Sequence, residues 1–198
     1  MKRAALGFHM HSGWGVLVAV SGDANLVELL DRRRIVVADP KIPGAIQPYH
    51  FAAQLEPPEQ EKHLASSAAS SARLAAKAIA EVIKELDGRH YGVVGASILL
   101  ASGRPLPPLA KILAAHPLIH TAEGEFFRHT AHSACEGLQI PVTAIRVREL
   151  DAQAKVAFAK RAGQVQSSIA SLGRSVGPPW TSDHKTAALA AALLLVRA

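Results

Sequence analysis

The chain has 198 residues, of which 49% are hydrophobic and 19% charged, and this composition excludes a disordered protein and predicts one globular domain over residues 1–198. Aromatic residues make up 5%, which disfavours a base-stacking platform for single-stranded nucleic acid. The formal net charge of +6 permits a polyanionic partner. Cys135 is the single cysteine, so no internal disulfide can form, as is typical of a cytoplasmic protein. The longest apolar run, 187–196, is about half a membrane span, and no membrane insertion is expected.

The first predicted elements form an antiparallel hairpin. Residues 14–20 are apolar and rich in valine, residues 21–25 are typical of a turn, and residues 26–39 resume a strand pattern. Three arginines, 32–34, lie in the second strand, where the first and third share one face of the sheet. Several prolines predict an irregular loop over 40–58.

Helices and buried strands then alternate. They are predicted at 59–86 (helix), 91–101 (strand), 107–115 (helix), 121–136 (helix), 141–147 (strand), 150–161 (helix), 164–172 (helix) and 182–196 (helix). Thr121 and Ser182 are expected to cap their helices, with Glu123 and Glu125 in the first turn of the helix at 121. This order predicts an α/β protein with a mixed central sheet flanked by helices.

Three stretches resemble a known superfamily. Residues 6–16 are similar to its opening strand, residues 121–147 to its helix and following strand, and residues 162–190 to its closing helices. The superfamily is the ribonuclease-H-like one, and the likeness is to its Holliday-junction resolvase branch. The resemblance implies a mixed sheet flanked by helices and a nucleic-acid partner.

The same resemblance predicts that most of the catalytic carboxylates are missing. These nucleases are expected to hold two Mg²⁺ ions about 4 Å apart with clustered carboxylates. His9 stands in the position of the opening-strand aspartate, the strand at 93–101 has no carboxylate, and only Asp183 matches an acidic position. Magnesium prefers oxygen ligands, so the resemblance implies that the standard nuclease activity is absent.

Histidines and acids nevertheless suggest a metal-dependent site. On a helix, Glu125, His129 and His132 fall on one face, a donor set that suits Zn²⁺ or another late first-row metal, although a solvated helix face would look the same. His9 and His11 share one face of the opening strand, also as candidate metal ligands. If the resolvase-like arrangement holds, these two histidines lie close to Asp183, His184 and Glu123. Asp183 and Glu123 would then be the catalytic acids. The structural alternative for Asp183 is that it assists the start of the last helix.

A phosphate-binding surface is the other candidate. Arg32, Arg33 and Arg34 would contribute salt-dependent affinity for nucleic acid, and the flexible Ser12-Gly13 turn would admit a phosphate. The structural alternatives are solvated charges that protect a sheet edge and an ordinary tight turn.

Three hypotheses about function follow. The first is a catalytically degenerate ribonuclease-H-like domain that binds nucleic acid or another phosphate-bearing partner. This hypothesis is preferred because it depends least on the catalytic residues that are missing. The second is a metal-dependent hydrolase with a His/Glu/Asp site and a divalent metal cofactor. The third is a structural or interaction protein without activity.

Overall fold

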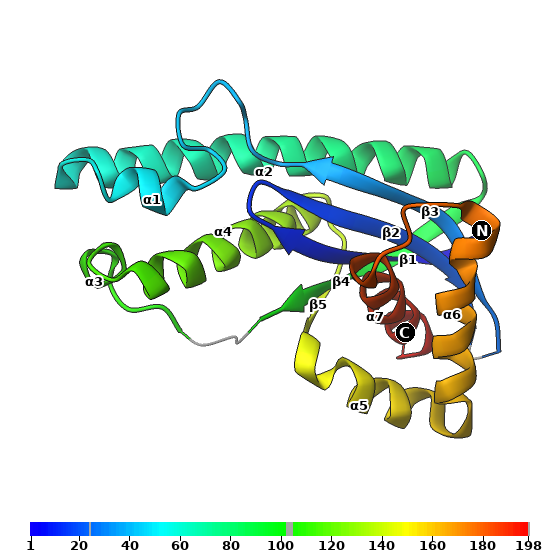
Figure 1. Cartoon of the computed structure of the whole chain (residues 1–198). Helices are drawn as coiled ribbons and strands as arrows, with labels where there is room; N and C mark the ends of the chain where they lie inside the picture. Colours follow the sequence, from blue (N-terminus) through cyan, green and yellow to red (C-terminus); the bar gives the residue numbers. More distant parts are fainter. Residues whose placement is uncertain (24, 102–104, 198) are drawn as a thin grey trace.

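A computed structural model describes residues 1–23, 25–101 and 105–197, and their central feature is a mixed β-sheet (Figure 1). Its strands are β1 (Lys2–His11), β2 (Trp14–Gly22), β3 (Val27–Val36), β4 (Tyr91–Leu100) and β5 (Val142–Arg146). They lie in the order β3-β2-β1-β4-β5. β1, β2 and β3 pair antiparallel, whereas β1, β4 and β5 pair parallel. The predicted α/β class, mixed sheet and antiparallel hairpin are confirmed.

Helices cover both faces of this sheet (Figure 1). They are α1 (Pro48–Ala52), α2 (Pro57–Asp87), α3 (Leu109–Leu113), α4 (His116–Gly137), α5 (Val147–Phe158), α6 (Ala162–Val176) and α7 (Ser182–Arg197), with a 3₁₀ turn at Ala159–Arg161. α2 and α4 pack on one face, and α5, α6 and α7 pack on the other. None of the helices in the described residues is long and apolar enough to span a membrane.

The central strand β1 is buried on both faces because its side chains alternate between two cores. Leu6 and Phe8 pack into the core formed with α2 and α4, whereas Ala5 belongs to the core formed with α7. α7 approaches β1 closely at Gly7. A Cβ there would overlap the carbonyl oxygen of Ala187 and lie 2.7 Å from its carbonyl carbon. The glycine therefore lets the last helix lie directly on the central strand.

Three local predictions are corrected. The helix expected from Thr121 begins at His116, so Thr121 is no cap, and its hydroxyl donates to the carbonyl of Pro117. Proline suits a first helical turn because its missing N–H would have no partner there. Ser182 lies inside α7 rather than capping it, because the carbonyl of Thr181 already accepts the N–H of Lys185. The loop predicted over 40–58 contains the short helix α1.

Candidate functional site

The structure brings His9, His11 and Asp183 together on the α7 face of the sheet. His11 Nε2 lies 2.9 Å from Asp183 Oδ2, and His9 Nδ1 lies 3.6 Å from Asp183 Oδ1. His9 Nδ1 is also 3.0 Å from the hydroxyl of Thr186. One donor atom from each of the histidines and the aspartate lies within 4.8 Å of the other two. We call these three residues the β1–α7 site.

Local structure explains this convergence. In a strand, residues two apart share a face, so His9 and His11 both point toward α7. Asp183 lies in the first turn of α7, where the close contact at Gly7 holds the helix against the strand. Negative charge is also favoured at this end of a helix. Sequence positions 172 residues apart thereby form one hydrogen bond between His11 and Asp183.

Burial affects the pKa of two histidines at or beside this site, His9 and His184. It is the main cause that lowers the pKa of His9 below 6.5, and the neighbouring charges of His11 and Arg128 lower the pKa further, while Asp183 opposes them. Burial also lowers the pKa of His184, with a contribution from Arg32. His9 is therefore neutral at pH 7 and has a free nitrogen lone pair, as a metal ligand requires.

A stack of planar side chains continues from the β1–α7 site across the sheet. The rings of His9 and His11 are parallel with centroids 5.1 Å apart, and His11 stacks on Trp14 at 4.4 Å. The guanidinium of Arg34 lies 4.1 Å from the Trp14 ring centroid, a cation–π contact. Arg34 is exposed, and among the described residues it has no ion-pair partner.

The other two arginines of the triplet are held by contacts within the protein. Arg32 donates to the carbonyls of Val176 at 2.8 Å and Gly177 at 3.0 Å, and also to those of Pro178 and Pro179. Arg33 lies on the face of β3 opposite to Arg32, where it pairs with Asp31 at 2.6 Å and with Glu85 of α2 at 2.7 Å. Within the described residues, Arg34 is thus the one guanidinium of the triplet that has neither an ion-pair nor a hydrogen-bond partner and can contact a ligand.

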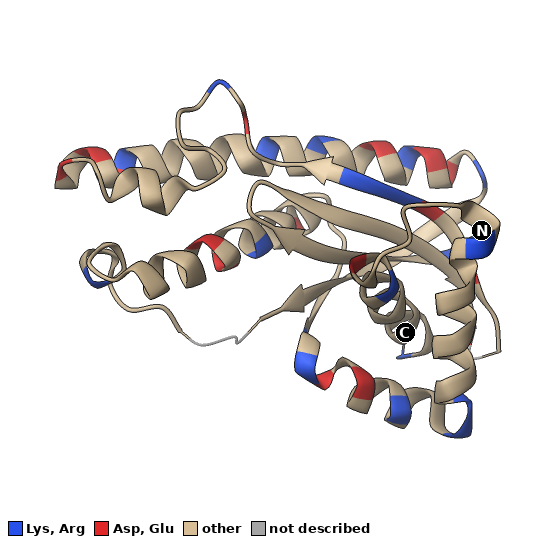
Figure 2. Ribbon diagram, in the orientation of Figure 1, with Lys and Arg blue, Asp and Glu red and all other residues tan. Residues whose placement is uncertain are grey.

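Two neighbouring pockets meet at Trp14 and Arg34. One, of about 380 Å³, is lined by the arginine triplet together with Asp183 and His184. The other, of about 530 Å³, is lined by Ser12, Gly13 and the chain after β3. The Gly13 carbonyl accepts two backbone N–H groups, which gives this turn a structural role while the exposed Ser12 still borders the pocket. Figure 2 shows the arginine segment of β3 in blue and the acidic start of α7 in red.

Glu123 lies in a different place. It is 2% exposed, and its Oε1 accepts the backbone N–H of His50 at 3.2 Å and lies 2.9 Å from His50 Nδ1. His50, His116 and His120 form a second group with donor atoms within 4.8 Å of one another. This group is not among the sites predicted from the sequence. The spacing of His116 and His120 was a usable signal, but it was hidden because the helix was expected to start at Thr121.

Glu125, His129 and His132 share a face of α4, as predicted, and line a pocket of about 610 Å³ between α4 and the strands β4 and β5. Glu125 pairs with Arg128 at 3.3 Å, and His132 pairs with Glu136 at 3.2 Å. Within the described ranges, the three donor atoms do not come within 4.8 Å of one another. The structure therefore joins neither this face nor Glu123 to the β1–α7 site.

The donor set at the β1–α7 site does not fit the pair of magnesium ions that the fold implies. It contains two imidazoles and a single carboxylate, and the neighbouring strand β4 has no acidic residue. Two Mg²⁺ ions need several oxygen ligands and negative charges to hold them at short distance. The set does suit a single late first-row cation, which accepts imidazole.

No protein-family model and no curated protein matches the sequence. Among solved structures, the chain is similar to Thermus thermophilus RuvC, with 14% identity, a TM-score of 0.53, and coverage of 98% of this chain and 93% of that chain. It is equally similar to T. thermophilus RuvC in complex with Holliday junction substrate, with 13% identity, a TM-score of 0.52 and the same coverage. The predicted resemblance is thus confirmed as a fold: the chain has the ribonuclease-H-like fold of RuvC.

Proposed function

We propose that this protein binds nucleic acid on the sheet face that carries the β1–α7 site, and does not cleave it by a two-magnesium reaction. The observation that carries the proposal is the donor set: Asp183 is joined there by two imidazoles rather than by further carboxylates. A structure with the same fold was solved with a Holliday junction bound, which supports nucleic acid as the partner class.

Arg34 and Trp14 are the groups best placed for binding. Arg34 is an exposed guanidinium with a planar fork that suits phosphate oxygens, and Trp14 holds it in position by stacking. The two groups border both pockets, so a strand of nucleic acid lying over them would pass beside Asp183 on one side and Ser12 on the other. The net charge of +6 favours the approach of a polyanion.

The absence of two-magnesium cleavage follows from charge. Two Mg²⁺ ions bring four positive charges, and one carboxylate neutralises only one of them. Neutral imidazoles add no negative charge and are poor magnesium ligands. Asp183 is in addition engaged by His11 at 2.9 Å and His9 at 3.6 Å. Asp183 and the two histidines therefore do not assemble the magnesium pair, and the contact to phosphate falls to Arg34.

A second candidate function is supported by the same geometry. His9, His11 and Asp183 are two imidazoles and one carboxylate with donor atoms within 4.8 Å, which is the donor set of a hydrolytic zinc site. A bound zinc ion supplies Lewis acidity for hydrolysis. His9 is neutral at pH 7 because burial lowers its pKa, so protons do not compete for its nitrogen.

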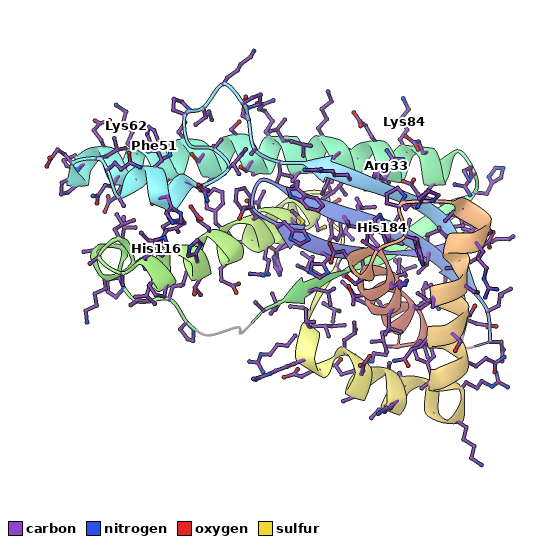
Figure 3. All side chains as sticks on the ribbon, viewed as in Figure 1. Arg33, Phe51, Lys62, Lys84, His116 and His184 are labelled. Atoms are coloured by element: carbon purple, nitrogen blue, oxygen red, sulfur yellow. The ribbon has the colours of Figure 1, made fainter. Side chains whose placement is uncertain are left out.

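Binding is tested with a fluorescently labelled four-way DNA junction, measured by anisotropy over a range of salt concentrations. Arg34→Ala should lower the slope of log affinity against log salt by about 0.9, the value for one lost phosphate contact. Lys84→Ala is the matched control, because Lys84 is an exposed cation on the outer side of α2 (Figure 3). Equal effects of the two changes, or no binding at low salt, would refute the proposal.

The second candidate is separated by its metal requirement. Hydrolysis of a phosphate ester that needs added Zn²⁺ and disappears in His11→Ala would favour the hydrolase. Salt-dependent DNA binding that survives complete metal removal, with no hydrolysis in Zn²⁺, would exclude it.

A further inference from the structure

The second histidine group lies where α1 meets the first turns of α4. His116 and His120 are one helical turn apart and share a face of α4, and His50 comes from α1 opposite them. Figure 3 shows His116 at the start of α4, across from α1. The ring centroids are 4.4 Å apart for His116 and His120, and 5.1 and 4.8 Å from His50 to each of them. Three imidazoles therefore face one small volume.

Glu123 orients the innermost histidine of this group. Its carboxylate is 2% exposed and accepts both the backbone N–H and the ring Nδ1–H of His50. When Nδ1 donates to a carboxylate, Nε2 carries the lone pair. Metal-binding histidines are commonly held in this way, with the second ring nitrogen fixed by a carboxylate behind them. His50 thus has the tautomer that a cation needs.

The buried carboxylate also calls for positive charge nearby. Burying an ionised carboxylate is costly unless a cation or strong donors compensate it. Among the described residues, Glu123 has no ion pair with Lys or Arg, and the side chain that contacts its carboxylate is the imidazole of His50. A divalent cation on the three imidazoles would supply the compensating charge.

We propose that His50, His116 and His120 bind one late first-row divalent cation, of which Zn²⁺ is the best match. Zinc–nitrogen bonds of ~2.0–2.1 Å in a tetrahedron place ligand nitrogens about 3.3 Å apart. The present donor atoms lie within 4.8 Å of one another, so each pair must close by at most about 1.5 Å. His116 and His120 are both exposed, so their side chains have room to rotate toward this geometry.

Such an ion would have three protein ligands and an open fourth position facing solvent. It would also join α1 to the start of α4, two elements that are distant in sequence. The positive end of α4 opposes a cation at His116, and the Glu123 carboxylate offsets this effect. The site is separate from the β1–α7 site, so it does not depend on the proposed nucleic-acid binding.

The test is calorimetric titration of chelator-treated full-length protein with Zn²⁺. The wild type should bind one equivalent that is lost in the double variant His116→Ala/His120→Ala. His129→Ala is the matched control, because His129 is an exposed histidine of the same helix outside the group. It should retain this equivalent. The double variant His9→Ala/His11→Ala should also retain it, even if the β1–α7 site binds an equivalent of its own.

Two further readouts complete the experiment. Zn²⁺ should raise the Tm of the wild type and of His129→Ala, but the part of the rise that comes from this site should be lost in His116→Ala/His120→Ala. Glu123→Gln should lower the Zn²⁺ affinity 10–100-fold, the effect typical of losing such a carboxylate. No binding at micromolar Zn²⁺, or binding unchanged in His116→Ala/His120→Ala, would overturn the proposal. Because these two histidines are exposed, the double variant should fold, which circular dichroism checks.

Discussion

The contact between β1 and α7 gives the sharpest stability prediction. A Cβ added to Gly7 would overlap the carbonyl oxygen of Ala187, and would lie 2.7 Å from its carbonyl carbon and 3.2 Å from the Cβ of Ala191. Carbon atoms pack without repulsion at about 3.5–4.0 Å, so Gly7→Ala forces α7 away by about 1 Å. Overpacking of this kind costs about 1–3 kcal/mol. For a chain of this length, the corresponding fall in Tm is about 2–12 °C.

Thermal unfolding followed by circular dichroism measures this effect. Gly163→Ala in α6 is the matched control, because a Cβ there has no heavy atom within 4 Å. Alanine is also the better helix former, so this variant should be as stable as the wild type or more stable by about 0.5–1 kcal/mol. A Gly7→Ala variant as stable as the wild type would refute the argument.

Three further predictions concern single side chains. Arg32→Ala should lower the free energy of unfolding by about 1–3 kcal/mol, because its hydrogen bonds to the 176–179 carbonyls are lost, and should leave the salt slope of DNA binding unchanged. Arg34→Ala should instead lower the salt slope and leave the free energy of unfolding unchanged. Urea unfolding and anisotropy distinguish the two, and similar results for both would contradict their assigned roles. The folded-state pKa of His9 lies below 6.5, so the unfolded chain binds more protons, and the free energy of unfolding should decrease as pH falls below 6.5. His9→Gln should flatten this decrease, and an unchanged pH profile would count against it. Burial raises the pKa of the Cys135 thiol to about 12, so a thiol reagent at pH 8 should label it only as fast as the protein unfolds; rapid labelling of the folded protein would be inconsistent with the structure.

The sequence predicted the elements whose signals are local. The valine-rich run at 14–20, the continuous apolar run at 91–101 and the alanine-rich last helix each carry their own periodicity or burial pattern. The approach of Asp183 to His9 and His11 also lay within reach, because the resemblance placed both segments at one edge of the sheet. Their donor distances depend on the close packing at Gly7, which no local pattern reveals.

Other features depend on contacts between distant segments. Arg32, Arg33 and Arg34 are equivalent in sequence, and only their partners on the 176–179 turn and on α2 show which of them is free. His50 lies in a proline-rich stretch that packs on both α2 and α4, so its contact with His116 depends on tertiary packing that no local pattern reveals. The prediction also started α4 five residues too late, which placed Glu123 in its first turn, whereas Glu123 lies in the second turn and is buried.

The central claim is that this ribonuclease-H-like fold binds nucleic acid without two-magnesium cleavage. One sample tests it: wild-type protein and a labelled four-way DNA junction in Mg²⁺, measured by anisotropy at about 50 and 200 mM salt and then run on a denaturing gel. We predict binding that weakens strongly at the higher salt and a junction that remains intact. Failure to bind at the lower salt, or magnesium-dependent cleavage that is lost in Asp183→Asn, would contradict the account.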